Sequence, residues 1–405
     1  MQHDALSPSE SAILAAIACD KERWTAIADQ IHGWAELGYQ EHRSSALLAT
    51  ELEQLGFEVT RGVAGLATAF RAVLRGPQAG PRIALLAEYD ALPGLGHACG
   101  HNLIGAAALA AAAGMRAVQA ELPGELHVYG TPAEEGYQPG AGGKVVMFEE
   151  GAFEGIDAAF IVHAGEPFSA GGTSLARDNF RLTFRGRRPR TGQARWDAVD
   201  SQDVMLLTQV ALNVLRQRVP PEVVIQWTIE QGGDNPNIIP VASSARLYVR
   251  APRLELVSQV VQRIKECAAG AAQATGGAYE FVRHAKLYDE MVPNRTLNEL
   301  FLAALVDAGA APGQIAPEPP GPVTHSDDTG IISKHLPTIS GRIVVGPPGL
   351  VLHTAEAAAA TRSPAAHRGL LIGAKAMALS AWRLANSPEL LSQAWSALSA
   401  AVGGA

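Results

Sequence analysis

The sequence predicts an α/β fold with a mainly parallel central sheet, helices on both faces of that sheet, and a smaller inserted α+β domain. Up to residue 176, short apolar runs typical of fully buried strands alternate with segments of helical periodicity. From residue 177 the strands instead alternate polar and apolar residues, as half-buried antiparallel strands do. A chain of 405 residues is also too long for one ordinary core, so two domains are expected.

The first part of the main domain, residues 1–176, begins with three helices and continues as alternating strands and helices. Apolar residues recur at helical spacing in three segments, and Gly56 ends the third. The runs 82–87 and 156–162 are short and continuous, which predicts strands buried on both faces. The other elements expected here are helices at 9–19, 22–37, 44–55, 144–150 and from Leu103, and strands at 67–74 and 125–129.

Residues 177–288 predict the inserted domain, in the order strand–helix–strand–strand–helix–strand. Its strands are expected at 180–184, 223–230, 245–249 and 278–284, and its helices at 201–218 and 254–272. Residues 289–405 return to the first pattern, with a helix, a proline-rich loop at 317–322, a strand at 337–345 and a long helical C-terminal region. The simplest arrangement is one main domain, residues 1–176 and 289–405, interrupted by the insert.

Composition argues against several classes of partner. A net charge of −8 and a pI of about 5.9 disfavour nucleic acid or an anionic membrane as the main partner. The most apolar run, 103–115, is shorter than the roughly 20 residues of a membrane-spanning helix. No signal peptide is recognised. The cysteines Cys19, Cys99 and Cys267 are widely spaced and odd in number, which argues against a disulfide framework and favours a reducing cytoplasm. Cys19 and Cys267 lie in helical patterns and are expected in the core.

A thiol and an imidazole stand two residues apart in the glycine-flanked turn Gly96–Asn102. Cys99 and His101 carry the ligand atoms that zinc and neighbouring transition metals prefer. A structural role explains the pair equally well, with the cysteine buried in the core and the histidine donating a hydrogen bond to a backbone carbonyl. The metal interpretation therefore depends on whether other residues complete the site.

Polar side chains follow the next two predicted strands at their carboxyl ends, where open α/β sheets place their sites. Glu134 and Glu135 follow the strand 125–129, so that one can bind a metal while the other acts as a general base. His163 ends the strand 156–162, and His353 lies in a loop that could close the site. Asp90 is expected either to orient a ligand histidine or to cap the following turn.

These residues belong to motifs that resemble the peptidase M20 family of metal-dependent amidohydrolases, which includes hippurate hydrolase, indole-acetyl-amino-acid hydrolase and aminobenzoyl-glutamate hydrolase. The similarity is greatest to the aminobenzoyl-glutamate branch and covers nearly the whole chain. The motifs occur in the family's order. They are Ala87-Glu88-Tyr89-Asp90-Ala91-Leu92-Pro93, His97-Ala98-Cys99-Gly100-His101-Asn102, Pro132-Ala133-Glu134-Glu135, Val162-His163-Ala164, Asn237-Ile238-Ile239-Pro240, Ser326-Asp327-Asp328-Thr329-Gly330 and His353-Thr354.

The resemblance implies a zinc-peptidase-like catalytic domain and an inserted lid that also mediates homodimerisation. It implies one or two divalent metals, zinc or manganese first and cobalt or nickel next, with Cys99 able to bridge two ions. Glu134 would be the general base, Asp328 a supporting carboxylate, and Gly233 and Asn237 would face the substrate. The implied metal ligands are Cys99, His101, Glu135, His163 and His353.

One segment departs from the family pattern. The family's lid carries a histidine after a Phe-x-Gly-Lys strand end, where it stabilises the developing oxyanion. Here Arg190 occupies that position in a basic hairpin, and its planar guanidinium suits a carboxylate or an oxyanion. Arg190 or Arg188 is therefore expected to touch the substrate, whereas a solvated basic hairpin is the structural alternative.

The leading hypothesis is a metal-dependent hydrolase that cleaves the amide of an N-acyl or N-aroyl amino acid, with Glu134 as the base and Arg190 offsetting oxyanion charge. The expected substrate bears a carboxylate and, in the aroyl case, an aromatic group. One alternative is hydrolytic deamination of an electron-poor aromatic amine, which releases ammonia. The other is a catalytically inactive binding protein on the same fold.

Overall fold

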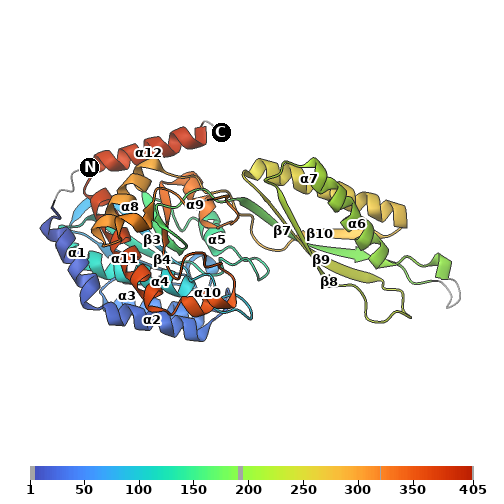
Figure 1. The fold of residues 1–405 in the computed structure, drawn as a ribbon, viewed down its shortest axis with the longest axis horizontal. Coiled ribbons are helices and arrows are strands. Elements are labelled where there is room, and N and C mark those ends of the chain that lie inside the picture. The colour runs from blue at the N-terminus through green and yellow to red at the C-terminus, as the bar shows by residue number, and fades with distance from the viewer. Residues whose placement is uncertain (1–4, 190–194, 320, 404–405) are drawn as a thin grey trace. The chain divides into compact units, whose positions relative to one another are not determined.

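The computed structural model describes residues 5–189, 195–319 and 321–403. The chain divides into two compact units, each of which is described by itself. The main unit comprises Met1–Thr173, Met291–Val323 and Asp328–Ala405, and the inserted unit comprises Ser174–Glu290 and Thr324–Asp327. Figure 1 shows both units, with the helices and several of the strands labelled.

The main unit is built on an eight-stranded sheet with the order β1-β2-β4-β3-β5-β12-β6-β11. The central pairs β4–β3, β3–β5 and β5–β12 are parallel, which confirms the predicted mainly parallel sheet. The strands β1, β2 and β4 add an antiparallel edge. The bounds are β1 Glu58–Arg61, β2 Phe70–Arg75, β3 Gln78–Ala87, β4 Pro123–Gly130, β5 Ala158–Ala164, β6 Phe168–Ser169, β11 Ile315–Ala316 and β12 Thr338–Ile343.

Helices cover both faces of this sheet, as the alternation of strands and helices predicts. In β5, Phe160 and Val162 belong to one core with α4 and α11, whereas Ala159 and Ile161 point to the other face and pack with α5 and α9. The helices are α1 Pro8–Cys19, α2 Lys21–Trp34, α3 His42–Gln54, α4 His101–Arg116, α5 Gly143–Glu149, α8 Arg295–Asp307, α9 Thr329–His335, α10 Ala355–Ala360, α11 Pro364–Ala385 and α12 Pro388–Gly403.

Helix α4 packs unusually close to the sheet because its sequence is rich in alanine and glycine. All residues from His101 to Met115 are buried. A Cβ atom added at Gly105 would lie 2.8 Å from the carbonyl oxygen of Glu88, so glycine is required for this approach. The helix begins at His101, two residues before the predicted start at Leu103, because Gly100 ends the preceding turn at φ 85°.

Two expectations about the elements and their burial are wrong or incomplete. Cys19 is exposed and Cys267, in the inserted unit, is half-buried. The buried side of α1 is occupied by Ile13 and Ile17, and Cys19 is its last residue. The short strands β1, β6 and β11 and the helix α9 are not predicted from the sequence, and β6 and β11, with two residues each, are too short to show any period.

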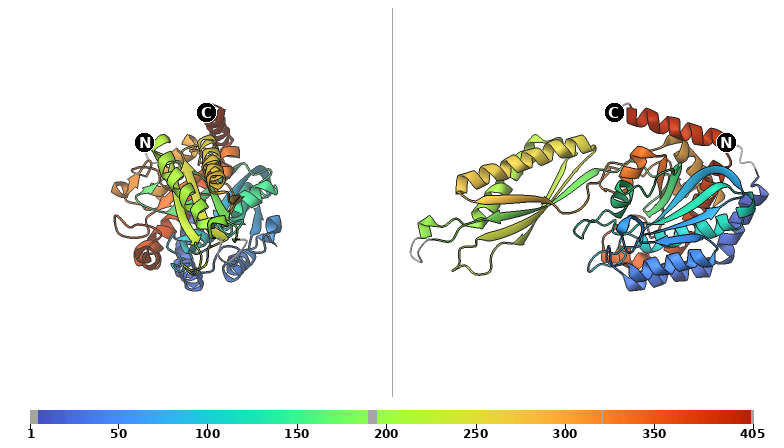
Figure 2. Two further views of the ribbon diagram at one scale, coloured as in Figure 1. Left: turned by 90° about the vertical axis from the view of Figure 1, so that its right-hand side faces the viewer. Right: turned by 180° about the vertical axis from the view of Figure 1, so that it is seen from behind.

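The inserted unit is a four-stranded antiparallel sheet of order β10-β7-β9-β8 with two helices on one face (Figure 2). Its element order is the predicted one. Alternate residues of β7, among them Leu182 and Phe184, pack against α6 and α7. The elements are β7 Ala176–Arg185, α6 Ser201–Leu215, β8 Val224–Gln231, β9 Ala242–Ala251, α7 Leu254–Thr275 and β10 Ala278–Arg283.

Among the described residues, no helix combines the length and the apolar character needed to cross a bilayer.

Candidate metal centre

The carboxyl ends of three neighbouring strands and the start of α4 bring a group of polar side chains together. Glu88 and Asp90 follow β3, Glu134 and Glu135 follow β4, and His163 is the penultimate residue of β5. Such strand ends meet at one edge of a parallel sheet, which is where open α/β folds place ligands. All these side chains lie in the main unit.

The turn before α4 is shaped by glycine and ties two distant parts of the site together. A Cβ at Gly100 would approach that of Ala164 to 2.8 Å, so only glycine lets the turn lie against the end of β5. The carbonyl of Ala98 accepts a hydrogen bond of 3.0 Å from the backbone N–H of His353. His353 has φ 64°, a left-handed conformation that is costly for a residue with a side chain.

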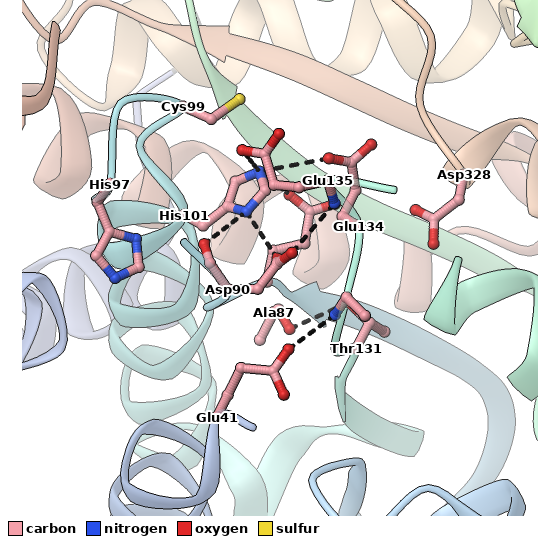
Figure 3. A network of polar contacts seen from close by, with 12 residues as sticks. Glu41, Ala87, Asp90, His97, Cys99, His101, Thr131, Glu134, Glu135 and Asp328 are labelled. Atoms are coloured by element: carbon pink, nitrogen blue, oxygen red, sulfur yellow. Dashed lines mark hydrogen bonds and ion pairs between the residues drawn. The ribbon is translucent and has the colours of Figure 1, made fainter. Parts of the chain in front are cut away.

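His101 is the best-connected side chain of the group (Figure 3). Its Nδ1 lies 2.8 Å from Asp90 Oδ1 and 3.1 Å from the Asp90 carbonyl, so Nδ1 carries the proton and donates it. Asp90 Oδ2 accepts the backbone N–H of Glu135 at 3.1 Å. Asp90 therefore fixes both the imidazole tautomer and the backbone of the neighbouring loop.

The Nε2 atom of His101 faces away from Asp90, toward three carboxylates. It lies 3.4 Å from Glu88 Oε2, 3.7 Å from Glu134 Oε2 and 4.0 Å from Glu135 Oε1. Figure 3 shows Glu134 and Glu135 on this side of the ring and Asp90 on the other.

The remaining predicted ligands join the same cluster. Cys99 Sγ lies 3.4 Å from His163 Nε2, while His163 Nδ1 lies 2.9 Å from the carbonyl of Ala164. His353 Nε2 lies 3.7 Å from Glu135 Oε2, although the His353 side chain is 54% exposed. Among the described residues, three sets of potential donors that lie wholly within the main unit have all their ligand atoms within 4.8 Å of one another: Cys99–His101–His163, Cys99–Glu135–His353 and His101–Glu134–Glu135.

The loop that carries Glu134 and Glu135 is held in a specific conformation by a buried carboxylate. Ala133 has φ 58°, and its N–H donates to Glu41 Oε1 at 2.9 Å while its carbonyl accepts from Gly142 at the same distance. Glu41 Oε2 accepts a hydrogen bond from Thr68 at 2.9 Å. Gly38 leaves room for the Ala133 side chain, because a Cβ there would lie 2.8 Å from it.

Burial and mutual charge shift several pKa values in this cluster. Burial raises the pKa of the Cys99 thiol, and nearby Glu135 adds to that effect. Burial also raises the pKa of Glu135 to about 7, although the charge of His101 opposes the shift. For Asp90, burial acts to raise the pKa, but the charge of His101, the hydrogen bonds from His101 and the Glu135 N–H, and the charge of Lys144 together lower it. Burial works against a charged His101, yet Asp90 and the other anionic groups raise its pKa well above the usual range.

These residues fit a divalent transition metal. Glu88 Oε2, Glu135 Oε1 and His101 Nε2 are buried and have no hydrogen-bond partner within the described parts of the chain. Unpaired buried acceptors are costly, and a cation among them removes that cost. Thiolate, imidazole and carboxylate together are the donor set of zinc and of neighbouring transition metals.

Buried residues beyond the predicted set also support this region. Glu88, Lys144 and Asp328 form a charge array with no exposed side-chain surface, in which the Lys144 ammonium contacts both carboxylates. The Lys144 backbone N–H also donates to Asp328 Oδ2 at 3.0 Å, so Asp328 holds both the backbone and the side chain of Lys144. Glu88 lies inside one of the family motifs and Lys144 follows a glycine-rich run, but neither pattern reveals the pairing. Glu41 carries no local signal at all.

The predicted substrate residues belong to the inserted unit, not to the unit that holds this cluster. Arg188, Gly233 and Asn237 are exposed, and Gly233 has φ 108°. Arg190 lies outside the described residues.

A family model described as Peptidase family M20/M25/M40 matches residues 84–378 of the chain. The Xaa-Arg dipeptidase of Mus musculus is 35% identical over 389 residues, which cover 91% of this chain and 87% of that protein. One of the p-aminobenzoyl-glutamate hydrolase polypeptides of Escherichia coli (strain K12) is 34% identical over 322 residues, 73% of this chain and 64% of that protein.

Solved structures share the fold. The aminobenzoyl-glutamate utilization protein from Klebsiella pneumoniae superposes with a TM-score of 0.73 at 17% identity, covering 91% of this chain and 98% of that one. The YXEP protein of Bacillus subtilis, described as a dinuclear metal-binding peptidase, gives a TM-score of 0.65 at 19% identity, covering 91% and 99%.

Proposed function

The chain belongs to peptidase family M20/M25/M40 and is a metal-dependent hydrolase of C–N bonds, and we propose that it cleaves the amide between an acyl or aroyl group and an amino acid. The observation that supports this most directly is the pair Glu134–Glu135 at the end of β4. Both carboxylates lie within 4.0 Å of His101 Nε2, as a metal ligand and a general base at one reacting centre would. The names of the dipeptidase and the aminobenzoyl-glutamate hydrolase support an amide substrate.

The proposed ligands of one or two divalent ions are Cys99, His101, Glu135, His163 and His353. Cys99 belongs to two of the potential donor sets, so its thiolate is suited to bridge two ions. Zinc and manganese suit the mixed donors best, with cobalt or nickel next. Such an ion, when bound, polarises the substrate carbonyl and lowers the pKa of water.

The protein's own groups then complete the reaction. Glu134 takes the proton of the attacking water and delivers it to the leaving amine, as a general base that becomes a general acid. Asp90 keeps the Nδ1 proton of His101 in place, so that Nε2 is the nitrogen that would bind a metal. Glu41 holds the Ala133 backbone, which positions Glu134.

We assign substrate recognition to the inserted unit. Arg188 and Arg190 are planar cations suited to a carboxylate or a developing oxyanion, and Asn237 and Gly233 offer polar and close backbone contacts. The exposure of Arg188 and Asn237 leaves their side chains available for a substrate.

The inserted unit also has a surface suited to a second copy of the chain. Strand β8 is at the edge of its sheet and pairs with β9 alone among the described strands. Helix α6 exposes apolar side chains at helical spacing, namely Leu206, Leu207, Val210 and Val214. An open strand edge beside an apolar helix face favours a homodimer, which sedimentation or light scattering will test. A reducing cytoplasm, the location we propose, agrees with three free cysteines.

A substrate panel tests the proposed function. Metal-reconstituted protein is incubated with hippurate, aminobenzoyl-glutamate, Xaa-Arg dipeptides and aminobenzoates, and both free amino acid and ammonia are measured. We expect release of an amino acid. Release of ammonia from an aminobenzoate would instead support the deaminase alternative. If the fully metallated protein hydrolyses no compound of the panel, the result would support a binding protein.

A further inference from the structure

Glu88 is a carboxylate that the proposed mechanism does not use. It follows β3 directly, its side chain has no exposed surface, and its Oε1 contacts the Lys144 ammonium. Its second oxygen, Oε2, has no hydrogen-bond partner among the described residues. A buried carboxylate oxygen without a partner costs free energy, so its presence calls for a ligand.

The unpartnered oxygen points at an equally unpartnered nitrogen. Glu88 Oε2 lies 3.4 Å from His101 Nε2, and neither atom has a hydrogen-bond partner in the part of the chain that the structure describes. Because Asp90 holds the Nδ1 proton, Nε2 is the ring nitrogen that can bind a cation on the Glu88 side. Two buried atoms of this kind face each other favourably only with a proton or a metal ion between them.

The distance between Glu88 Oε2 and His101 Nε2 suits a shared metal ion better than a hydrogen bond. A charge-assisted hydrogen bond between nitrogen and a carboxylate would draw the atoms to about 2.7–2.9 Å. Two ligand atoms at about 2.0–2.2 Å from a tetrahedral ion are instead about 3.4 Å apart. The observed 3.4 Å therefore agrees with the edge of a coordination tetrahedron.

Lys144 holds this carboxylate in a fixed orientation. Its ammonium lies between Glu88 Oε1 and Asp328 Oδ1, and all three side chains are fully buried. Its backbone N–H also donates to Asp328. The ammonium offsets the charge of Glu88 on one side and leaves Oε2 as the oxygen that can bind an ion.

We propose that Glu88, held by Lys144, is a further metal ligand that shares an ion with His101. The proposal rests on the metal centre described above but not on any particular substrate. A carboxylate oxygen is a hard ligand, whereas a thiolate is a soft one. Adding Glu88 therefore shifts the preference of the site toward manganese, relative to a site of thiolate and imidazole alone.

The decisive experiment is a crystal structure of the full-length protein loaded with manganese, with zinc in a second crystal. We expect a Glu88 oxygen about 2.0–2.2 Å from an ion that also binds His101 Nε2. A loaded site in which both Glu88 oxygens lie beyond bonding distance would overturn the proposal while leaving the metal centre intact. A protein that binds no metal at all would remove both.

Metal affinity provides the second readout, measured by chelator competition on folded protein. Glu88→Gln should weaken manganese binding at least tenfold and zinc binding less, and Lys144→Met should weaken manganese binding by a smaller factor. Glu10→Gln is the matched control, because it removes a mostly buried carboxylate that pairs with Arg383 instead. Unchanged manganese affinity in Glu88→Gln would also overturn the proposal, and if that variant does not fold, the loaded structure decides.

Discussion

The metal centre and the substrate residues of the inserted unit differ most in burial. His101, Glu134 and Asp90 are buried, and each lies close to charged groups of the same cluster. Arg188 and Asn237 are exposed and belong to the other unit. The first group is organised by folding itself, before any substrate arrives. The second contributes through contacts that only a bound substrate completes. We therefore expect changes in the metal centre to affect kcat, and changes in the inserted unit to affect mainly KM.

Removing the metal should have the largest effect. Dialysis against a chelator is expected to abolish hydrolysis and to lower the melting temperature, because the buried acceptors of the centre lose their cation. Adding zinc or manganese back should restore both. Full activity in protein shown by elemental analysis to contain no metal would contradict the assignment.

Glu134→Ala should have the next largest effect. Loss of a general base is expected to lower kcat by about 10²–10⁴-fold, with little change in KM. Metal content, measured by mass spectrometry of the purified protein, should stay at the wild-type level. If the metal is lost together with activity, Glu134 is a ligand and the base lies elsewhere.

Glu41→Gln should change how stability depends on pH. Burial and the charge of Asp90 raise the pKa of Glu41 to about 8, from an unfolded value of 4.5. Between these values the folded protein binds more protons than the unfolded chain, so the wild-type free energy of unfolding falls as pH rises from about 5 to 8. A neutral glutamine lacks this term.

Urea unfolding of the metal-free proteins at pH 5, 6.5 and 8 measures the difference. The stability of Glu41→Gln relative to wild type should increase over this range by a few kcal/mol, of the order set by about 1.4 kcal/mol per pKa unit. Parallel pH profiles for the two proteins would show that Glu41 is ionised throughout.

Arg188→Ala should have the smallest effect, and it tests the other side of the comparison. Loss of one exposed cation is expected to raise KM for a carboxylate-bearing substrate by about 3–10-fold and to leave kcat within a factor of two. Arg181→Ala is the control, because this exposed arginine of the same unit pairs with Glu230. Equal effects of the two variants would exclude a specific role for Arg188.

Periodicity and motif order are sufficient to predict much of the fold. The continuous apolar run of β5 and the alternating strands of the inserted unit indicate the correct sheet types, because burial on one or two faces leaves its own pattern. The prediction for Cys19 is wrong because helical spacing alone does not show where a helix leaves the core. Strands of two residues, such as β6 and β11, have too few residues for a pattern.

The closeness of Glu134, Glu135 and His163 is predictable because these residues lie at the carboxyl ends of neighbouring parallel strands. The site is not predictable where a residue acts through a distant partner. Glu41 is 92 positions from Ala133, and Lys144 is 56 positions from Glu88 and 184 from Asp328. Such pairings are created by topology, and no local spacing in the sequence encodes them.

Gly105 determines how closely helix α4 approaches the chain at Glu88. It lets α4, which begins with His101, approach the backbone of Glu88 more closely than any side chain would permit. The distance between these two residues is therefore set by the thickness of a helix–strand contact that lies outside the site. The distance between two potential ligands, and with it the size of ion that fits between them, thus depends on a residue that does not contact the ion. Replacing Gly105 by alanine would change that distance.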